Sequence, residues 1–206
     1  HLSVRRQRQM CIRDRYFALD ILIINAAGPK NRNPEVEIVG DWMVEDWDAT
    51  MDSSLRAYMV TAKFAHPYMQ RTNGGSIVNM GSTLAFSIAE QQSCAYHVAK
   101  AGVTQLTRYL AWELGNDGIQ VNCICPALVD RSDRPSLTND PTNQSVVDIT
   151  VPLKRAGNYK DIAYTSHFLC SDEAKYLTGQ SIILDGGLTL GSQFEVARAA
   201  YKKIQS

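Results

Sequence analysis

The feature that most constrains the fold is an alternation between short apolar runs and longer segments with the period of an amphipathic helix. The apolar runs have the length of strands, and the segments between them repeat apolar residues every three or four positions. Strands that alternate with helices in this way form a parallel sheet joined by crossover helices. From residue 16 onward the sequence therefore predicts an α/β fold, and no internal repeat interrupts the pattern.

The predicted strands are residues 19–25, 76–80, 119–125 and 181–184. The first is predicted to be fully buried, because Ile and Leu fill it without polar alternation. It runs into residues 25–28, whose small side chains let the backbone approach another backbone or a ligand. A tight turn is expected directly after the last strand, at residues 185–187.

Helical spacing appears in residues 46–69, 95–114 and 161–170, and residues 193–204 are expected to form a helical tail. Glycines follow the first two segments, as they often do where a helix ends. Residues 130–150 are rich in Ser, Thr, Asn, Asp and Pro and have no clear period. They are interpreted as either a mobile loop or a short helical lid over a site.

The composition fits one globular domain, since the 206 residues are 45% hydrophobic and 20% charged. Lys plus Arg and Asp plus Glu balance at 21 each, so no net field favours nucleic acid or an anionic membrane. No apolar stretch approaches the roughly eighteen residues that cross a bilayer. We therefore expect small-molecule chemistry, with no nucleic-acid partner and no membrane span.

The first fifteen residues differ from the rest, because they carry five arginines and almost no apolar periodicity. We interpret residues 1–15 as a disordered or artefactual leader, in preference to a nucleic-acid-binding arm. Residues 16–190 are then the globular domain and residues 191–206 a tail.

The cysteines are odd in number and show no paired metal-ligand spacing; they are Cys11, Cys94, Cys123, Cys125 and Cys170. We interpret them as reduced core residues of a cytoplasmic protein, and no metal site is predicted.

Tyr96 and Lys100 form a Tyr-x-x-x-Lys pair within the second predicted helix. Residues four apart share a helix face, so the phenol and the ammonium are expected close together. A free phenol titrates at about pH 10, and a neighbouring cation favours the ionised form that a tyrosine acid or base needs. Alone, such a pair is more often a surface contact. His97 beside it is predicted to be a hydrogen-bonded or exposed neighbour, not a catalyst.

Other candidate residues follow the predicted strands. Residues 25–28 follow the first strand, Ser82 follows the second, and Pro126 closes the third. The carboxyl ends of parallel strands lie at one edge of a sheet, and open α/β sheets bind ligands there. We therefore expect Ser82, Pro126 and Tyr96 to surround one site.

With these residues the chain resembles the short-chain dehydrogenase/reductase family, from about residue 19 to residue 187. The segments that match the family's C-terminal pattern are Pro152-Leu153-Lys154-Arg155-Ala156-Gly157, Asp161-Ile162-Ala163, Phe168-Leu169-Cys170-Ser171-Asp172-Glu173-Ala174, Thr178-Gly179-Gln180 and Asp185-Gly186-Gly187. The resemblance implies a Rossmann-like doubly wound parallel sheet and an enzyme that uses NAD or NADP. It implies hydride transfer that interconverts a secondary alcohol and a ketone.

By this resemblance Tyr96 is the general acid/base, Lys100 lowers its pKa and holds the nicotinamide ribose, and Ser82 binds the substrate oxygen. Ser54 stands where the family has a catalytic Asn, and a serine there is expected to hold a relay water. The interval from Ser82 to Tyr96 is one residue longer than usual. Thr83 is therefore a rival for the role of Ser82.

The resemblance also implies a cofactor site, whose residues are Asn25, Ala26, Ala27, Gly28, Tyr96, Lys100, Pro126, Ala127 and Val129. Ala127 stands where the family has Gly, and Arg131 stands near its cofactor-binding Thr. The nicotinamide side of the site therefore departs from the family pattern.

The family's glycine-rich turn, Thr-Gly-x-x-x-Gly-x-Gly, is not found in the sequence. The resemblance then predicts that the first two strand-helix units are absent and that residues 19–25 form an open sheet edge. We expect a fragment that is inactive alone. Its parent is expected to form a homodimer or homotetramer through the two long helices and the last strand.

Two other functions stay open. A non-catalytic protein that uses the fold for oligomerisation or partner binding is favoured by Ser54, by Ala127 and by the missing glycine-rich turn. The presence of Ser82, Tyr96 and Lys100 opposes it. An epimerase or dehydratase of nucleotide sugars also uses Tyr-x-x-x-Lys, but too few residues follow residue 187 for its substrate domain.

Overall fold

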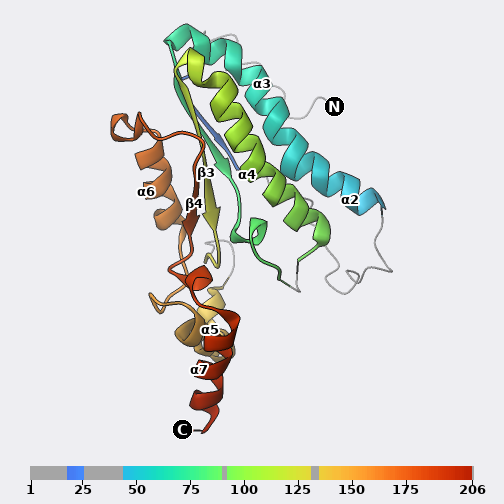
Figure 1. The fold of residues 1–206 in the computed structure, drawn as a ribbon, viewed down its shortest axis with the longest axis vertical. Coiled ribbons are helices and arrows are strands. Elements are labelled where there is room, and N and C mark those ends of the chain that lie inside the picture. Colours follow the sequence, from blue (N-terminus) through green and yellow to red (C-terminus); the bar gives the residue numbers. More distant parts are fainter. Residues whose placement is uncertain (1–17, 26–43, 90–91, 131–134, 206) are drawn as a thin grey trace.

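The computed structural model describes residues 18–25, 44–89, 92–130 and 135–205 (Figure 1). The proposed leader, residues 1–15, lies outside these ranges, as do Ala26, Ala27, Gly28 and Arg131. The predictions made for those residues stay predictions.

Four parallel strands form one sheet in the order β1-β2-β3-β4. The strands are β1 (Ile21–Ile24), β2 (Gly75–Met80), β3 (Ile119–Pro126) and β4 (Ser181–Leu184). Parallel pairing requires each connection to cross back over the sheet, and helices supply these crossovers. The predicted α/β class with a parallel sheet is confirmed.

The longer helices are α2 (Val44–Met51), α3 (Ala57–Met69), α4 (Cys94–Leu114), α5 (Pro141–Thr150), α6 (Tyr159–Leu169) and α7 (Gln193–Gln205). Short turns of other helical types are η1 (Asp52–Arg56), η2 (Gln70–Thr72), η3 (Thr83–Ala85), η4 (Gly115–Asp117), η5 (Leu137–Asn139), η6 (Asp172–Ala174) and η7 (Leu188–Leu190). Among the described helices, none has the length and apolar character needed to cross a membrane.

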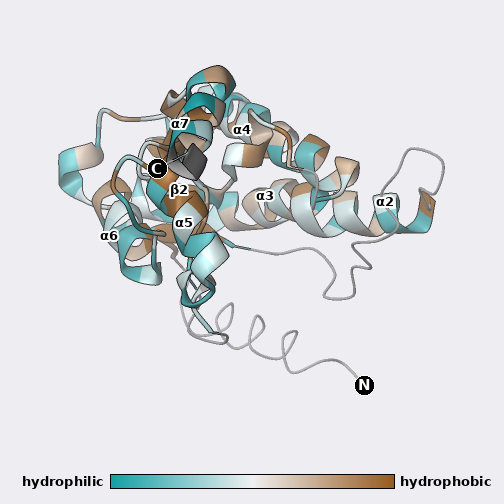
Figure 2. Ribbon diagram, turned by 90° about the horizontal axis from the view of Figure 1, so that it is seen from below, coloured by the Kyte–Doolittle hydropathy of each residue, from teal (hydrophilic) through white to brown (hydrophobic). Residues whose placement is uncertain are grey.

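Helices cover both faces of the sheet. Side chains alternate between the faces along a strand, so Ile77 of β2 packs with α3 and α4, whereas the next residue, Val78, packs toward α6. On β3, Val121 belongs to the first cluster and Ile124 to the second. Figures 1 and 2 show α6 on the opposite side of the strands from α3 and α4. The doubly wound arrangement of three layers is therefore present.

The helix predicted at residues 46–69 begins two residues earlier, at Val44, and contains a π-helical turn. Helices α2 and α3 are joined by η1, in which the backbone N–H of Ala57 donates to the carbonyl of Asp52, five residues earlier. Such turns occur often at functional sites. Leu55 of η1 packs closely on α4, because a Cβ added to Gly102 would lie 2.8 Å from its Cδ2. The π turn thus lies against the helix that carries Tyr96 and Lys100.

Strand β1 is an edge of the described sheet, and the prediction that it is fully buried is wrong. Ile21 and Ile23 are each 47% exposed, whereas Ile24 is buried against the α3–α4 layer. Within the described residues β1 pairs only with β2. Leu22 and Ile24 pack on the face that α3 and α4 cover, whereas Ile21 and Ile23 point to the opposite face, which explains the alternate exposure. The edge position of β1 in the described sheet agrees with the open edge that the sequence predicted.

Residues 130–150 contain a helix rather than only a loop, so the helical alternative holds for residues 141–150. Asp140 caps α5, since its Oδ1 accepts from the backbone N–H of Thr142 at 2.7 Å, and Pro141 occupies the first turn. Helix α7 packs against α5 at the end of the molecule that carries the C-terminus (Figure 1).

The expected turn at residues 185–187 is present. Gly186 and Gly187 both have positive φ, and the carboxylate of Asp185 accepts from the N–H of Gly187 at 2.8 Å. Positive φ suits glycine, which explains the two adjacent glycines.

Candidate active site

The site is built at the carboxyl ends of β2 and β3. The N–H of Gly81, just after β2, donates to the carbonyl of Ile124 in β3 at 2.7 Å. This bond extends the ladder one residue beyond β2 and fixes where the chain leaves the sheet. A Cβ on Gly81 would lie 2.7 Å from the Sγ atoms of both Cys123 and Cys125, so glycine permits this close approach.

Ser82 begins the turn η3 and is buried. Its backbone is extended, and its Oγ accepts from the N–H of Leu84 at 3.2 Å, while its carbonyl accepts from the N–H of Ala85. A serine in this capping position satisfies a donor of the turn that would otherwise have no partner. The neighbouring Thr83 is also buried, and its hydroxyl donates to the carbonyl of Pro126 at 3.5 Å.

Tyr96 lies in the first turn of α4, which packs against η3. Ser93 caps this helix, because its Oγ accepts from the N–H of Tyr96 at 3.2 Å. The Tyr96 side chain is half-buried. The capped helix end therefore places Tyr96 beside the turn that carries Ser82.

Lys100 is 4% exposed, and its ammonium is held from several sides. Its Nζ donates to the carbonyl of Met80 at 2.7 Å and to the hydroxyl of Tyr58 at 3.3 Å. It lies 5.6 Å from the ring centroid of Tyr96 and 5.2 Å from that of Tyr58, both within cation–π range. The predicted proximity of Tyr96 and Lys100 is confirmed.

Sequence reasoning did not single out Tyr58 and missed its polar contact. The ring is fully buried in α3, and the hydroxyl donates to the carbonyl of Met80 at 2.9 Å. Burial raises the pKa of this hydroxyl above its ordinary value, and Cys123 and Tyr96 add to the rise. A tyrosine hydroxyl needs a partner when it is buried, and the carbonyl of Met80 supplies one here.

Ser54 is buried in η1, and its Oγ has no hydrogen-bond partner within the part of the chain that the structure describes. An unpartnered buried hydroxyl costs stability. Lys100 contacts Tyr58, which lies four residues after Ser54 in the sequence. The relay role given to Ser54 stays a prediction.

The cofactor-side residues lie at the same edge of the sheet. Asn25, directly after β1, is exposed, and Pro126, Ala127 and Val129 are partly exposed after β3. The N–H of Ala127 donates to the carbonyl of Leu184, and Val129 forms an isolated parallel bridge with Gly157. These contacts hold the segment after β3 against the last strand and the loop before α6.

The described cysteines are free thiols, as predicted, although only two of the four are buried: Cys123 and Cys125 are, whereas Cys94 and Cys170 are half-buried. The Sγ atoms of Cys123 and Cys125 lie 3.7 Å apart. The contact with Cys125 and burial together raise the pKa of the Cys123 thiol. Within the described residues, no group of three His, Cys, Asp or Glu side chains is arranged to hold a metal ion.

His97 is buried and hydrogen-bonded, which agrees with the first of the two environments predicted for it, hydrogen-bonded or exposed. Its Nδ1 lies 2.7 Å from the carbonyl of Ser93, and its Nε2 accepts from the N–H of Ala89 at 3.0 Å. It joins α4 to the segment that follows η3.

The chain is similar to known proteins over most of its length. The profile of the family described as Enoyl-(Acyl carrier protein) reductase matches residues 10–189. Human "Dehydrogenase/reductase SDR family member 4" is 36% identical over 169 residues, which are 82% of this chain and 59% of that protein. The 3-oxoacyl-acyl-carrier-protein reductase FabG of Staphylococcus aureus is 32% identical over 173 residues, which are 84% of this chain and 67% of that one.

Solved structures show the same fold. A short-chain type dehydrogenase/reductase from Mycobacterium ulcerans superposes with a TM-score of 0.79 at 30% identity, covering 89% of this chain and 65% of that one. The chain spans about three fifths of the length of the human relative. Because the profile matches most of the chain and the relatives and the fold agree with it, the chain belongs to the short-chain dehydrogenase/reductase family.

Proposed function

We propose that this chain carries the catalytic residues of an NAD- or NADP-dependent oxidoreductase that interconverts a secondary alcohol and a ketone. The observation that carries the proposal is the position of the Lys100 ammonium, 5.6 Å from the Tyr96 ring centroid, on a helix that packs against the turn of Ser82. A cation, a phenol and a hydroxyl at the carboxyl ends of two parallel strands suit proton transfer to or from a substrate oxygen.

Ser82 is proposed to bind the substrate oxygen. Its Oγ uses a lone pair to accept from the N–H of Leu84, which leaves the hydroxyl proton to donate. The hydroxyl proton of Thr83 instead goes to the carbonyl of Pro126, although that contact is long at 3.5 Å. This difference favours Ser82 over Thr83.

Tyr96 is proposed to exchange the proton. In the direction of reduction its hydroxyl gives a proton to the substrate oxygen, and in the direction of oxidation its phenolate takes the proton back. The nearby Lys100 ammonium favours the phenolate, and the positive end of the α4 dipole acts in the same sense, because Tyr96 lies in the first turn.

The residues present fit the nicotinamide half of the cofactor. Lys100 is a donor-only cation, and Pro126, Ala127 and Val129 line the partly exposed segment after β3. Asn25 at the end of β1 would lie beside the adenosine half. When bound, the nicotinamide ring supplies or accepts the hydride. The chain's own part is to hold the substrate oxygen at Ser82 and to move its proton at the Tyr96 hydroxyl.

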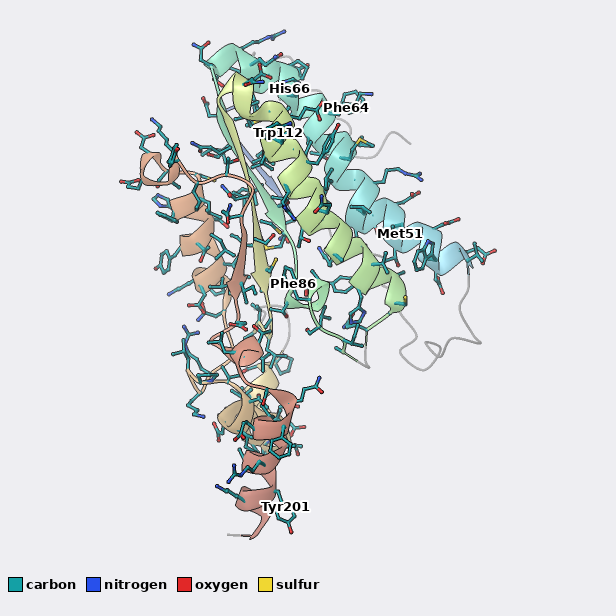
Figure 3. The ribbon with its side chains drawn as sticks, viewed as in Figure 1. Met51, Phe64, His66, Phe86, Trp112 and Tyr201 are labelled. Atoms are coloured by element: carbon teal, nitrogen blue, oxygen red, sulfur yellow. The ribbon has the colours of Figure 1, made fainter. Side chains whose placement is uncertain are left out.

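The relatives' names point to carbonyl substrates, since FabG is described as a 3-oxoacyl-acyl-carrier-protein reductase. For this chain we propose a small ketone or the matching alcohol. We also propose that the full protein forms a homodimer or homotetramer, because large apolar side chains such as Phe64 of α3 and Trp112 of α4 are exposed (Figure 3).

The proposal is tested by fluorescence titration of the purified chain with NADH and with NADPH, followed by turnover assays on a panel of small ketones and secondary alcohols. We expect saturable binding that weakens at least tenfold in a Tyr96→Phe, Lys100→Ala double variant, because both side chains face the ribose and substrate in this arrangement. The matched control is Tyr109→Phe with Lys160→Ala, since both of those residues are exposed.

Equal binding by the double variant and the control would contradict the proposed site. A folded chain that binds neither nucleotide would count against oxidoreductase activity of this chain alone and would agree with the expected fragment, whose chemistry needs the rest of its parent.

A further inference from the structure

Tyr58, Lys100 and Met80 form a hydrogen-bonded set between α3, α4 and the end of β2. The carbonyl of Met80 accepts from both the Tyr58 hydroxyl, at 2.9 Å, and the Lys100 ammonium, at 2.7 Å. The two donors also contact each other at 3.3 Å. Both side chains are buried, so few solvent contacts compete with these bonds.

The direction of each proton follows from the chemistry of the groups. An ammonium can only donate, so the Tyr58 oxygen accepts at its contact with Lys100. The single hydroxyl proton of Tyr58 is then directed to the carbonyl of Met80. Because burial disfavours the phenolate, Tyr58 stays neutral and presents a fixed lone pair to Lys100. It is an acceptor for the lysine and not a second proton carrier.

The Tyr58 ring also limits the movement of the ammonium. A lysine head is a compact charge on a flexible four-carbon stem, so its position depends on what surrounds it. Here the ring centroid of Tyr58 lies 5.2 Å from Nζ and that of Tyr96 lies 5.6 Å away. Two aromatic rings and a carbonyl therefore restrict the ammonium to one place beside Tyr96.

Ser54 does not supply this contact in the structure. Its Oγ is buried without a hydrogen-bond partner in the described residues, whereas the polar contact from the same helical segment comes from Tyr58. Ser54 lies within the π turn η1, and Tyr58 lies in the first turn of α3.

We propose that Tyr58 is a positioning residue that holds the Lys100 ammonium beside the Tyr96 phenol. The inference rests on the proposed function for its effect on catalysis, but not for the contact itself.

The contact is tested by the reactivity of Lys100 toward reductive methylation with formaldehyde, measured residue by residue with peptide mass spectrometry. In the unaltered chain Lys100 should react far more slowly than exposed lysines such as Lys160 and Lys175. Tyr58→Phe keeps the ring but removes the hydroxyl, and we expect Lys100 to react about tenfold faster. The control Ser54→Ala should leave the rate unchanged. An unchanged rate in Tyr58→Phe would overturn the proposal.

The effect on catalysis is tested by the pH profile of alcohol oxidation. Loss of the Tyr58 hydroxyl should let Lys100 move away from Tyr96, so the acidic limb of the profile should shift upward by about one pH unit. The control Tyr109→Phe removes the hydroxyl of an exposed tyrosine of α4 and should not shift it. The thiols of Cys123 and Cys125, which also interact with Lys100, are the same in both variants. A purely structural role would lower stability without moving the limb, and that result would overturn the positioning role.

If the proposed function is wrong, neither variant has a pH profile to shift, but the methylation result still decides the contact. If Tyr58→Phe does not fold, the reciprocal measurement uses tyrosine labelled with 13C at Cζ. Replacing Lys100 by Met should then shift the Tyr58 resonance, and Ser54→Ala should not. An unmoved Tyr58 resonance in Lys100→Met would contradict the proposal.

Discussion

The Nε2 atom of His97 accepts a hydrogen bond from the backbone N–H of Ala89 at 3.0 Å. The other ring nitrogen, Nδ1, lies 2.7 Å from the carbonyl of Ser93 and must donate to it. These two bonds fix the neutral tautomer with its proton on Nδ1. They also tie the segment after Ser82 to the start of α4, next to Tyr96.

The first prediction concerns this tie. His97→Phe keeps a buried ring but loses both hydrogen bonds, so the free energy of unfolding should fall by about 1 kcal/mol. The amide of Ala89 should exchange with deuterium faster, and denaturant melts with hydrogen-exchange mass spectrometry measure both effects. Val98→Thr, at the exposed neighbouring position, is the control. Unchanged exchange at Ala89 would show that the histidine does not hold this segment.

The second prediction separates the two candidate hydroxyls. Ser82→Ala should lower kcat/KM about 100-fold, because it removes a donor to the substrate oxygen. Thr83→Val should change kcat/KM by less than about threefold, because its hydroxyl contacts the Pro126 carbonyl. Steady-state assays of both variants on one ketone decide the matter. The opposite order of effects would assign the role to Thr83.

The third prediction concerns the close approach at Gly81. Gly81→Ala should destabilise the chain by about 1–3 kcal/mol, because the new methyl would meet the Sγ atoms of Cys123 and Cys125 at 2.7 Å. The same substitution made in a Cys123→Ala, Cys125→Ala background should cost less. A double-mutant cycle from urea melts measures the difference. Equal costs in the two backgrounds would mean that the thiols are not the obstacle.

The fourth prediction is a pH dependence at the start of α6. Arg155 donates to both carboxylate oxygens of Asp161, which lowers the pKa of Asp161, as does the hydrogen bond from the Asn158 backbone. Such a carboxylate stabilises the folded state when the pH is above its pKa in the unfolded chain, which is about 3.9. The stabilisation is lost as the pH falls through its pKa in the folded chain.

Asp161→Asn should therefore lower Tm at neutral pH, and its difference from the unaltered chain should shrink as the pH falls below about 4. Thermal melts from pH 3 to pH 8 measure it. Asp148→Asn, a carboxylate on α5, provides a control at each pH. A difference that stays constant across this range would contradict the assignment to the Asp161 charge.

The fifth prediction concerns self-association. Trp112 on α4 is 87% exposed, so Trp112→Glu should leave the fold of one chain intact. If the α3 and α4 helices form an interface between copies, the variant should have a lower mass in solution by light scattering. Tyr176→Glu, at a fully exposed position elsewhere, is the control. Identical masses for Trp112→Glu and the unaltered chain would exclude this interface.

Local patterns predicted the elements of the sheet because burial imposes a period on the residues that form it. The strand at residues 181–184 agrees with β4, and the helix at residues 95–114 begins one residue earlier, at Cys94, in α4. The error at β1 arose because an apolar run has the same composition whether helices cover both faces of the strand or only one. Exposure of Ile21 and Ile23 depends on neighbours that the run itself does not encode.

The same division applies to the site. The four-residue spacing of Tyr96 and Lys100 determined by itself that the two side chains share a helix face, because helix geometry is local. The role of Tyr58 was decided only by tertiary structure, since α3 and the end of β2 bring its hydroxyl to Lys100 across 42 positions of sequence. Contacts between distant segments depend on how the whole sheet and its helices pack. No pattern in the residues around Tyr58 could therefore distinguish a packed ring from a ring that also holds a cation.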